Sequence, residues 1–334
     1  MSGEDPLKTL FRELVLAASM ICILVAGMWA LTGSMPPLVV VESASMTHDL
    51  ESGEVGSIDA GDLVLVYDIK PSAIITFAEA TDDRNPRYGY DSHGMPGDVV
   101  IYQKNGMDDT PIIHRAILRA VPHSTLTPVD GNCNQGSFDP ISTDPETGKP
   151  GVCVLTWDVP GTNQIDVEKI SVMFDGEQAG LYECGRNENF DHGFADVLTI
   201  SEWDPEHAGL LTLGDANKCS VDQGGSASQG SQGLHTTGGV VGAVRDDWVI
   251  GKAGEEIPWL GVVKLMVSGG DSPGVSQVPG MSFVYLFITI ASVLVIPLVL
   301  DPLFKVVLRG APEYEEVKRE MALDSVIEAL GEEE

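Results

Sequence analysis

Basic residues are scarce in this chain of 334 residues: 19 Lys and Arg stand against 50 Asp and Glu, a formal net charge of −31. Phosphate binding needs a basic surface, so this balance argues against a nucleic-acid-binding protein. Hydrophobic residues nevertheless make up 43% of the chain, whereas acidic disordered proteins are poor in them. The apolar and the acidic residues must therefore be segregated into different parts of the sequence.

Charge is absent from two apolar runs, residues 14–31 and residues 281–300. An α-helix rises about 1.5 Å per residue, so a helix formed by either run could cross a hydrocarbon core roughly 30 Å thick. The alternatives are a cleaved signal peptide for the first run, although no A-x-A site follows it promptly, and a buried core helix for the second. The basic residues Lys8, Arg12, Lys305 and Arg309 flank the outer ends of the two runs.

These flanking charges predict that both termini are cytoplasmic. The expected organisation is a cytoplasmic N-terminus (1–13), a transmembrane helix (14–31), an extracytoplasmic domain (32–280), a second transmembrane helix (281–300) and an acidic cytoplasmic tail (301–334). The lipid bilayer of the cell membrane is thus an expected partner. Within the predicted domain 32–280, 37 acidic and 13 basic residues give a net charge of −24. Such a domain would repel itself in dilute buffer, but about 1 M salt shortens the Debye length to roughly 3 Å. We therefore expect a high-salt habitat, as in halophilic archaea.

No C-x-x-C pair occurs, which leaves a zinc site with little support. Cys22 lies in the first apolar run, and the other four cysteines lie in the predicted extracytoplasmic domain, where disulfides can form. Four cysteines allow three pairings. The most natural local bridge joins Cys133 to Cys153, which leaves Cys184 to pair with Cys219.

The predicted external domain is mainly β and antiparallel, because short apolar runs alternate with Gly, Pro, Asn and Asp. The expected strands are 37–41, 62–68, 97–104, 111–121, 210–213, 240–245 and 259–267. Residues 122–208 are too many for a structureless loop. We interpret them as an inserted β-rich subdomain, with strands expected at 152–157, 164–174 and 195–200.

A serine, a histidine and two aspartates stand in short motifs of this domain. Ser45 follows the apolar run PLVVV, His114 interrupts the apolar run PIIHRAI, and Asp215 and Asp222 lie in LLTLGDANKCSVD. A serine hydroxyl becomes a nucleophile when a base takes its proton, and a third group must orient that base. The G-x-S-x-G elbow of α/β-hydrolases is absent. The residue types alone leave open that these are a turn serine, a buried strand histidine and turn aspartates.

Five segments in order resemble the successive conserved boxes of type I signal peptidases. They are VVVESASM, AGDLVLVYD, GDVVIYQKNG with TPIIHRAI, LLTLGDANKCSVD, and GGVVGAV with IPWLGVVKLM. They are most similar to the archaeal and eukaryotic microsomal catalytic subunit, because His114 stands where the bacterial branch has a lysine. The resemblance implies an antiparallel β catalytic domain of the signal-peptidase type, flanked by the two transmembrane helices.

The resemblance implies a serine endopeptidase that needs no metal or cofactor. Ser45 corresponds to the nucleophile and His114 to the general base. Asp222 is favoured as the partner of His114, with Asp215 in a supporting role, and the assignment between them stays open. Ser43 and the Ser45 backbone N–H correspond to the oxyanion donors.

Shallow apolar pockets for the small substrate side chains are expected from Val41, Met46 and Ile113. The departures from the family pattern are Ala44, where many relatives have Gly, and Thr47-His48 after the methionine. We expect His48 to be a solvated loop residue.

The implied activity is cleavage of N-terminal signal peptides from secreted preproteins after small residues. Preprotein signal peptides are the expected partners, and the protein-secretion translocon is a further candidate. The main alternative is a membrane-tethered β domain without activity, such as an adhesin, an assembly factor or an inactive relative. Another membrane hydrolase, sortase-like or self-cleaving, is the third interpretation.

Overall fold

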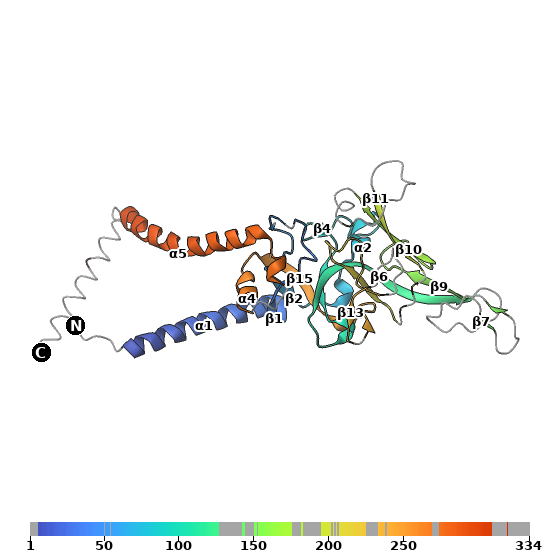
Figure 1. Cartoon of the computed structure of the whole chain (residues 1–334), viewed down its shortest axis with the longest axis horizontal. Helices are drawn as coiled ribbons and strands as arrows, with labels where there is room; N and C mark the ends of the chain where they lie inside the picture. Colours follow the sequence, from blue (N-terminus) through green and yellow to red (C-terminus); the bar gives the residue numbers. More distant parts are fainter. Residues whose placement is uncertain are drawn as a thin grey trace. The chain divides into compact units, whose positions relative to one another are not determined.

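The computed structural model is β-rich, with two long helices near its ends (Figure 1). The residues that the structure describes are 6–49, 51–53, 55–126, 142–143, 150–151, 153–175, 182, 195–201, 203, 205, 207–224, 233–237, 239–268, 274–308 and 319. The chain divides into two compact units, Met1–Ser282 and Phe283–Glu334.

Both long helices are apolar and lie largely outside any protein core. Helix α1 spans Pro6–Thr32, and helix α5 spans Gly280–Leu308. Their apolar windows, Leu10–Thr32 and Gly280–Leu300, are 0% and 6% buried, so neither helix packs as a core helix of the protein. By length and composition, both could cross a membrane, and a signal sequence would pass the same test in the case of α1. The chain is thus compatible with a two-span membrane protein.

A seven-stranded antiparallel sheet forms the centre of the first unit. Its strand order is β1-β2-β15-β5-β6-β12, and β9 pairs with the C-terminal part of β6, from Val121 to Leu126. The strands of this sheet are β1 (Gly33–Val40), β2 (Leu63–Tyr67), β5 (Val99–Tyr102), β6 (Ile112–Leu126), β9 (Cys153–Asp158), β12 (Gly209–Leu213) and β15 (Val249–Ile257). Strand β1 continues directly from α1, so the first edge of the sheet begins where the helix ends.

Short strand pairs and short helices surround this sheet. The strand pairs are β3 (Asp91–Ser92) with β4 (Met95–Pro96), β7 (Ser142–Thr143) with β8 (Pro150–Gly151), β10 (Lys169–Asp175) with β11 (Ala195–Ser201), and β13 (His235–Thr236) with β14 (Gly239–Val240). The helices are α2 (Phe77–Thr81) and α4 (Val262–Val267), with 3₁₀ turns η1 (Pro71–Ala73), η2 (Lys104–Gly106), η3 (Asp246–Trp248) and η4 (Val275–Gln277).

Two of the expected strands are wrong. The apolar run 259–267 is not a strand, because its second half forms α4, with Val262 and Leu265 buried on one face. A strand that we did not expect, β15, precedes it and pairs with both β2 and β5. Residues 240–245 contribute only Val240 to a strand, and Val244 makes an isolated bridge to Leu210.

The described strands of segment 122–208 share a core with the main sheet. Side chains from β10 and β11, among them Ile170 and Leu198, are fully buried in one cluster with Ile117 of β6 and Leu211 of β12. Phe77 of α2 belongs to the same cluster. The insertion is therefore packed against the sheet that carries the candidate site, and strand β10 begins at Lys169 rather than at residue 164.

Candidate catalytic site

Ser45 lies in a tight loop that leaves the edge strand β1. The main chain at Val41 is fastened to the neighbouring loop, because Val41 N–H donates to Asp62 O and Val41 O accepts from Gly61 N–H, both at 2.9 Å. A turn follows, in which Thr47 N–H donates to Ala44 O at 3.2 Å. Met46 is only 1% exposed and anchors this turn in the core. The half-buried Ser45 is thus presented by a loop that is fixed at both ends.

His114 meets the hydroxyl of Ser45 from strand β6, which lies between β5 and β12 in the sheet. It lies on β6 opposite Val100 of β5 and is 4% exposed. Its Nε2 is 2.8 Å from Ser45 Oγ, and its Nδ1 is 2.6 Å from Asp222 Oδ2. An ionised carboxylate can only accept, so the Nδ1–H donates to Asp222 and the lone pair of Nε2 faces the Ser45 hydroxyl. These contacts have the geometry of a Ser-His-Asp triad, an arrangement suited to nucleophilic acyl transfer.

Asp222 is held by hydroxyl groups from two strands. Thr212 Oγ1 donates to Asp222 Oδ2 at 2.6 Å, and the Tyr102 hydroxyl donates to the same oxygen at 2.8 Å. The Asp222 N–H donates to Thr212 O at 3.0 Å. Burial and the charge of Asp222 raise the pKa of Tyr102 well above its usual value, so this phenol keeps its proton. The carboxylate that faces His114 therefore has a fixed position and fixed donors.

Asp215 contacts a different set of residues and not His114. Arg115 Nε and Nη2 donate to its two oxygens at 2.8 and 2.7 Å, and the Tyr182 hydroxyl donates to Oδ1 at 2.8 Å. Burial alone would raise the pKa of Asp215, but the charge and hydrogen bonds of Arg115, with a contribution from His48, lower it well below the usual value. Asp215 is thus the buried counter-ion of Arg115, which is itself 0% exposed.

The neighbours of Asp215 in sequence contact the triad directly. Ala216 N–H donates to Ser45 O at 2.9 Å. A Cβ added at Gly214 would lie 2.7 Å from His114 Nε2 and 2.6 Å from Ser45 O, closer than real Cβ atoms approach. The segment 214–216 therefore fits against the Ser45–His114 pair without space for a side chain at Gly214.

Ser43 lies beside Ser45, and their hydroxyl oxygens are 3.1 Å apart. Within the described part of the chain, the Ser45 N–H donates to no acceptor. The Ser43 hydroxyl thus lies next to Ser45 Oγ, and the Ser45 N–H is free to donate to a ligand.

The three residues expected to line substrate pockets have different environments. Val41 and Met46 are 2% and 1% exposed and belong to one core cluster, so neither offers a surface to a ligand. For these two the expected lining role is corrected: both are core residues of the segment that carries Ser45. Ile113 is half-buried and packs against the same cluster, and it keeps accessible surface next to His114.

The expectation for His48 is also wrong. Its Nε2 lies 2.8 Å from Asp215 Oδ2, and its side chain is only 20% exposed. His48 thus joins the end of the Ser45 loop to the Asp215–Arg115 ion pair. Sequence reasoning missed this contact and also missed Tyr102, Thr212, Arg115 and Tyr182, because nothing in the local sequence marks a strand hydroxyl or a buried arginine as part of a site.

The cysteine pairing falls mostly outside the described residues. Cys219 is disulfide-bonded, whereas Cys133 and Cys184 lie outside the described ranges and the side chain of Cys153 is not described. The exposed Cys22 has a free thiol. In the described ranges, no group of three or more His, Cys, Asp or Glu side chains is arranged to hold a metal ion.

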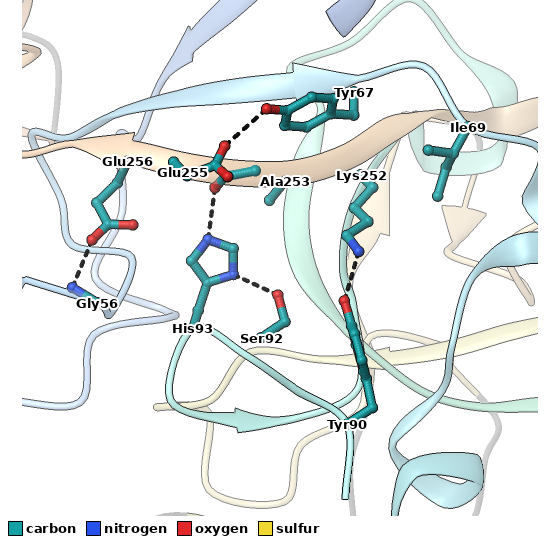
Figure 2. A pocket seen from close by; sticks show the side chains of 11 residues that line it. Gly56, Tyr67, Ile69, Tyr90, Ser92, His93, Lys252, Ala253, Glu255 and Glu256 are labelled. Carbon is teal, nitrogen blue, oxygen red and sulfur yellow. Dashed lines mark hydrogen bonds between the residues drawn. The ribbon is translucent and has the colours of Figure 1, made fainter. Parts of the chain in front are cut away.

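An open cavity of about 540 Å³ lies between β15, β2 and the β3–β4 hairpin and is not lined by the triad (Figure 2). Its polar side chains bond to one another: His93 contacts Ser92 Oγ at 2.9 Å and Gly254 O at 2.8 Å, and Lys252 Nζ donates to the Tyr90 hydroxyl at 2.7 Å. Burial lowers the pKa of His93 and favours its neutral ring. The named polar groups of the cavity are therefore paired with each other or with the backbone.

Comparisons of the chain with protein-family models, with curated proteins and with solved structures found no match. The chemistry of the site therefore has to be inferred from its own geometry.

Proposed function

We propose that this protein is a membrane-bound serine endopeptidase of the signal-peptidase I type, which cleaves N-terminal signal peptides from preproteins after small residues. The observation that carries the proposal is the pair of short contacts at His114, 2.8 Å to Ser45 Oγ and 2.6 Å to Asp222 Oδ2. The five segments that resemble the boxes of this family include all three residues. A tethered β domain without activity would have no need for a histidine held between a hydroxyl and a buried carboxylate.

The proposed reaction uses the triad and the two donors beside it. His114 Nε2 takes the hydroxyl proton while Ser45 Oγ bonds to the scissile carbonyl carbon. The Ser43 hydroxyl and the Ser45 N–H stabilise the oxyanion, and Asp222 stabilises the imidazolium ion. The proton then passes to the leaving amine, which releases the mature protein. Water hydrolyses the acyl-enzyme and releases the signal peptide.

The outer edge of strand β1 is a candidate binding site for an extended substrate peptide. Strand β1 is the first strand in the sheet order, and in the described part of the chain its outer edge has no partner strand. An extended peptide could add to this edge through main-chain hydrogen bonds and would run toward Ser45, which follows β1. The candidate span α1 leads into the same strand, so a membrane-inserted signal peptide would reach the site from the same side.

The experiment is a cleavage assay with the full-length protein in lipid vesicles at high salt. The substrate is a preprotein with an A-x-A site, and Ser45→Ala and His114→Ala are compared with the wild type. Both variants should lose cleavage by a factor of about 10³ or more, because the nucleophile or its base is gone. The exposed residues Ser72 and His235 provide matched control variants, Ser72→Ala and His235→Ala, which should cleave normally. Cleavage by Ser45→Ala at the wild-type rate would contradict the proposal.

A further inference from the structure

Two side chains from the segment that follows β15 reach the loop that carries Ser43. Lys264 of α4 donates to Glu42 Oε1 at 2.6 Å. Gln277 of η4 accepts a hydrogen bond from the Ala44 N–H through its Oε1 at 2.8 Å. The two contacts therefore fasten the residues immediately before and after Ser43.

The loop has few other external contacts at this point. Val41 is fixed by the main chain of residues 61 and 62, and Ser45 O is fixed by Ala216 N–H. Between these two anchors, the hydrogen bonds from outside the loop that the structure describes are those of Lys264 and Gln277. Among the residues that the structure describes, the Ser43 hydroxyl hydrogen-bonds only with Ser45 Oγ, at 3.1 Å. The position of Ser43 thus depends on how its two neighbours are held.

The two contacts differ in how salt affects them. Lys264 and Glu42 have side chains about half exposed, at 52% and 45%, and an exposed ion pair contributes little and is screened by salt. The bond between Gln277 and Ala44 joins an uncharged amide oxygen to a backbone N–H, so salt does not screen it. In a protein with a net charge of −31, the uncharged bond is the one that stays effective at high ionic strength.

We propose that Gln277 is a positioning residue for the oxyanion hole: through the Ala44 N–H it holds the Ser43 hydroxyl beside Ser45. This inference rests on the proposed endopeptidase activity. It assigns a role in the reaction to the segment that joins the β domain to the second apolar helix. Gln277 acts through Ser43 and does not itself contact the reacting atoms.

The experiment is a double-mutant cycle between Gln277 and Ser43, with kcat and KM measured in the vesicle assay at high salt. Gln277→Met keeps the length of the side chain and removes the acceptor, and Gln277→Glu keeps an acceptor oxygen. Ser43→Ala removes the hydroxyl. Gln164→Met is the matched control, because Gln164 Oε1 accepts the Ser171 N–H at 2.8 Å in a similarly exposed bond within the insertion.

We expect Gln277→Met to lower kcat roughly tenfold with KM changed less than about twofold, because a displaced donor affects the transition state. Gln277→Glu should recover most of the rate, and Gln164→Met should leave it unchanged. In the Ser43→Ala background, Gln277→Met should cost no further rate, since the group that it positions is already absent.

Four results would overturn the inference. Additive losses in the cycle would mean that Gln277 acts on general stability and not through Ser43. A faster Gln277→Met variant would mean that Gln277 blocks the site. If Gln277→Met keeps the wild-type kcat while Ser45→Ala is inactive, the role of Gln277 is overturned and the proposed function stands. No cleavage by the wild-type protein would overturn the proposed function and the inference together.

Discussion

Replacing Gly214 by alanine tests whether the close approach of this residue to the Ser45–His114 pair is needed for activity. The added Cβ would lie 2.7 Å from His114 Nε2, 2.7 Å from Asn217 Nδ2 and 2.6 Å from Ser45 O. Real Cβ atoms essentially never come closer than 3.0 Å to such neighbours. The amide of Asn217 can rotate away, but the backbone oxygen and the imidazole ring have to move.

The required displacement acts on the distance that defines the triad. To reach 3.0 Å, His114 Nε2 has to withdraw by about 0.3 Å, and Ser45 O has to withdraw by about 0.4 Å. Ser45 Oγ and His114 Nε2 are now 2.8 Å apart, and the same methyl group pushes the ring of His114 and the backbone of the residue that carries Oγ. Misplacement of reacting groups by about 1 Å costs roughly 100-fold in rate, and overpacking costs about 1–3 kcal/mol in stability. We expect kcat/KM to fall by at least about tenfold and up to about 100-fold.

Two other glycines provide controls for this variant. A Cβ at Gly209 would lie 2.7 Å from Val244 O, a comparable clash at the other end of β12 and away from the triad. A Cβ at Gly242 would meet nothing closer than 3.7 Å. In thermal unfolding, Gly209→Ala and Gly214→Ala should be destabilised similarly, and Gly242→Ala should not. In the cleavage assay, only Gly214→Ala should lose activity. Wild-type kcat/KM in Gly214→Ala would refute the reasoning.

Two further predictions concern pH and stability. Burial raises the pKa of Asp62 to about 7, against the opposing backbone N–H bonds of Trp259 and Asp59. Its folded pKa therefore lies above the unfolded value of about 3.9, so the stability that it contributes is complete below about pH 4 and is lost as the pH rises through about 7. Asp62→Asn should flatten this part of the curve of unfolding free energy against pH, and an unchanged slope would contradict it. For Asp215 the sign is opposite, because its pKa is lower in the folded than in the unfolded protein. Its contribution to the unfolding free energy is therefore present above about pH 4 and is lost as the pH falls from the unfolded pKa toward the folded pKa. Asp215→Asn leaves the Arg115 charge buried and unpaired, and thermal unfolding at pH 7 should show a loss of about 3–5 kcal/mol; a variant that unfolds like the wild type would rule this out.

The sequence predicted the strands whose side chains alternate or form a continuous apolar run. The segment DLVLVYD became β2, with alternate burial of its residues, and GDVVIYQK became β5, with all four strand residues buried. The run 259–267 misled the prediction, because a short apolar run fits a strand and a buried helix equally well. Strand β15 has no such run, since Gly251 and Gly254 interrupt it. Its identity as a strand comes from the partners β2 and β5 on its two sides.

In the candidate site, too, some residues could be predicted from the local sequence and others could not. His114 could be singled out because it interrupts an apolar run, and Ser45 because it directly follows one; the neighbours of both resemble a known pattern. The supporting residues could not be found in this way. Tyr182 belongs to the insertion and reaches Asp215 across 33 residues of sequence, and Gln277 reaches Ala44 across 233. Such contacts depend on how distant segments pack together.

The sequence by itself determined the two apolar helices, the acidic character of the chain and the residue types available for catalysis. It could not decide between Asp215 and Asp222, which lie seven residues apart in one segment. The tertiary structure separates them because consecutive residues of a strand point to opposite faces of a sheet. His114 and Arg115 are neighbours on β6, so each finds its own carboxylate: Asp222 on the side of His114 and Asp215 on the side of Arg115.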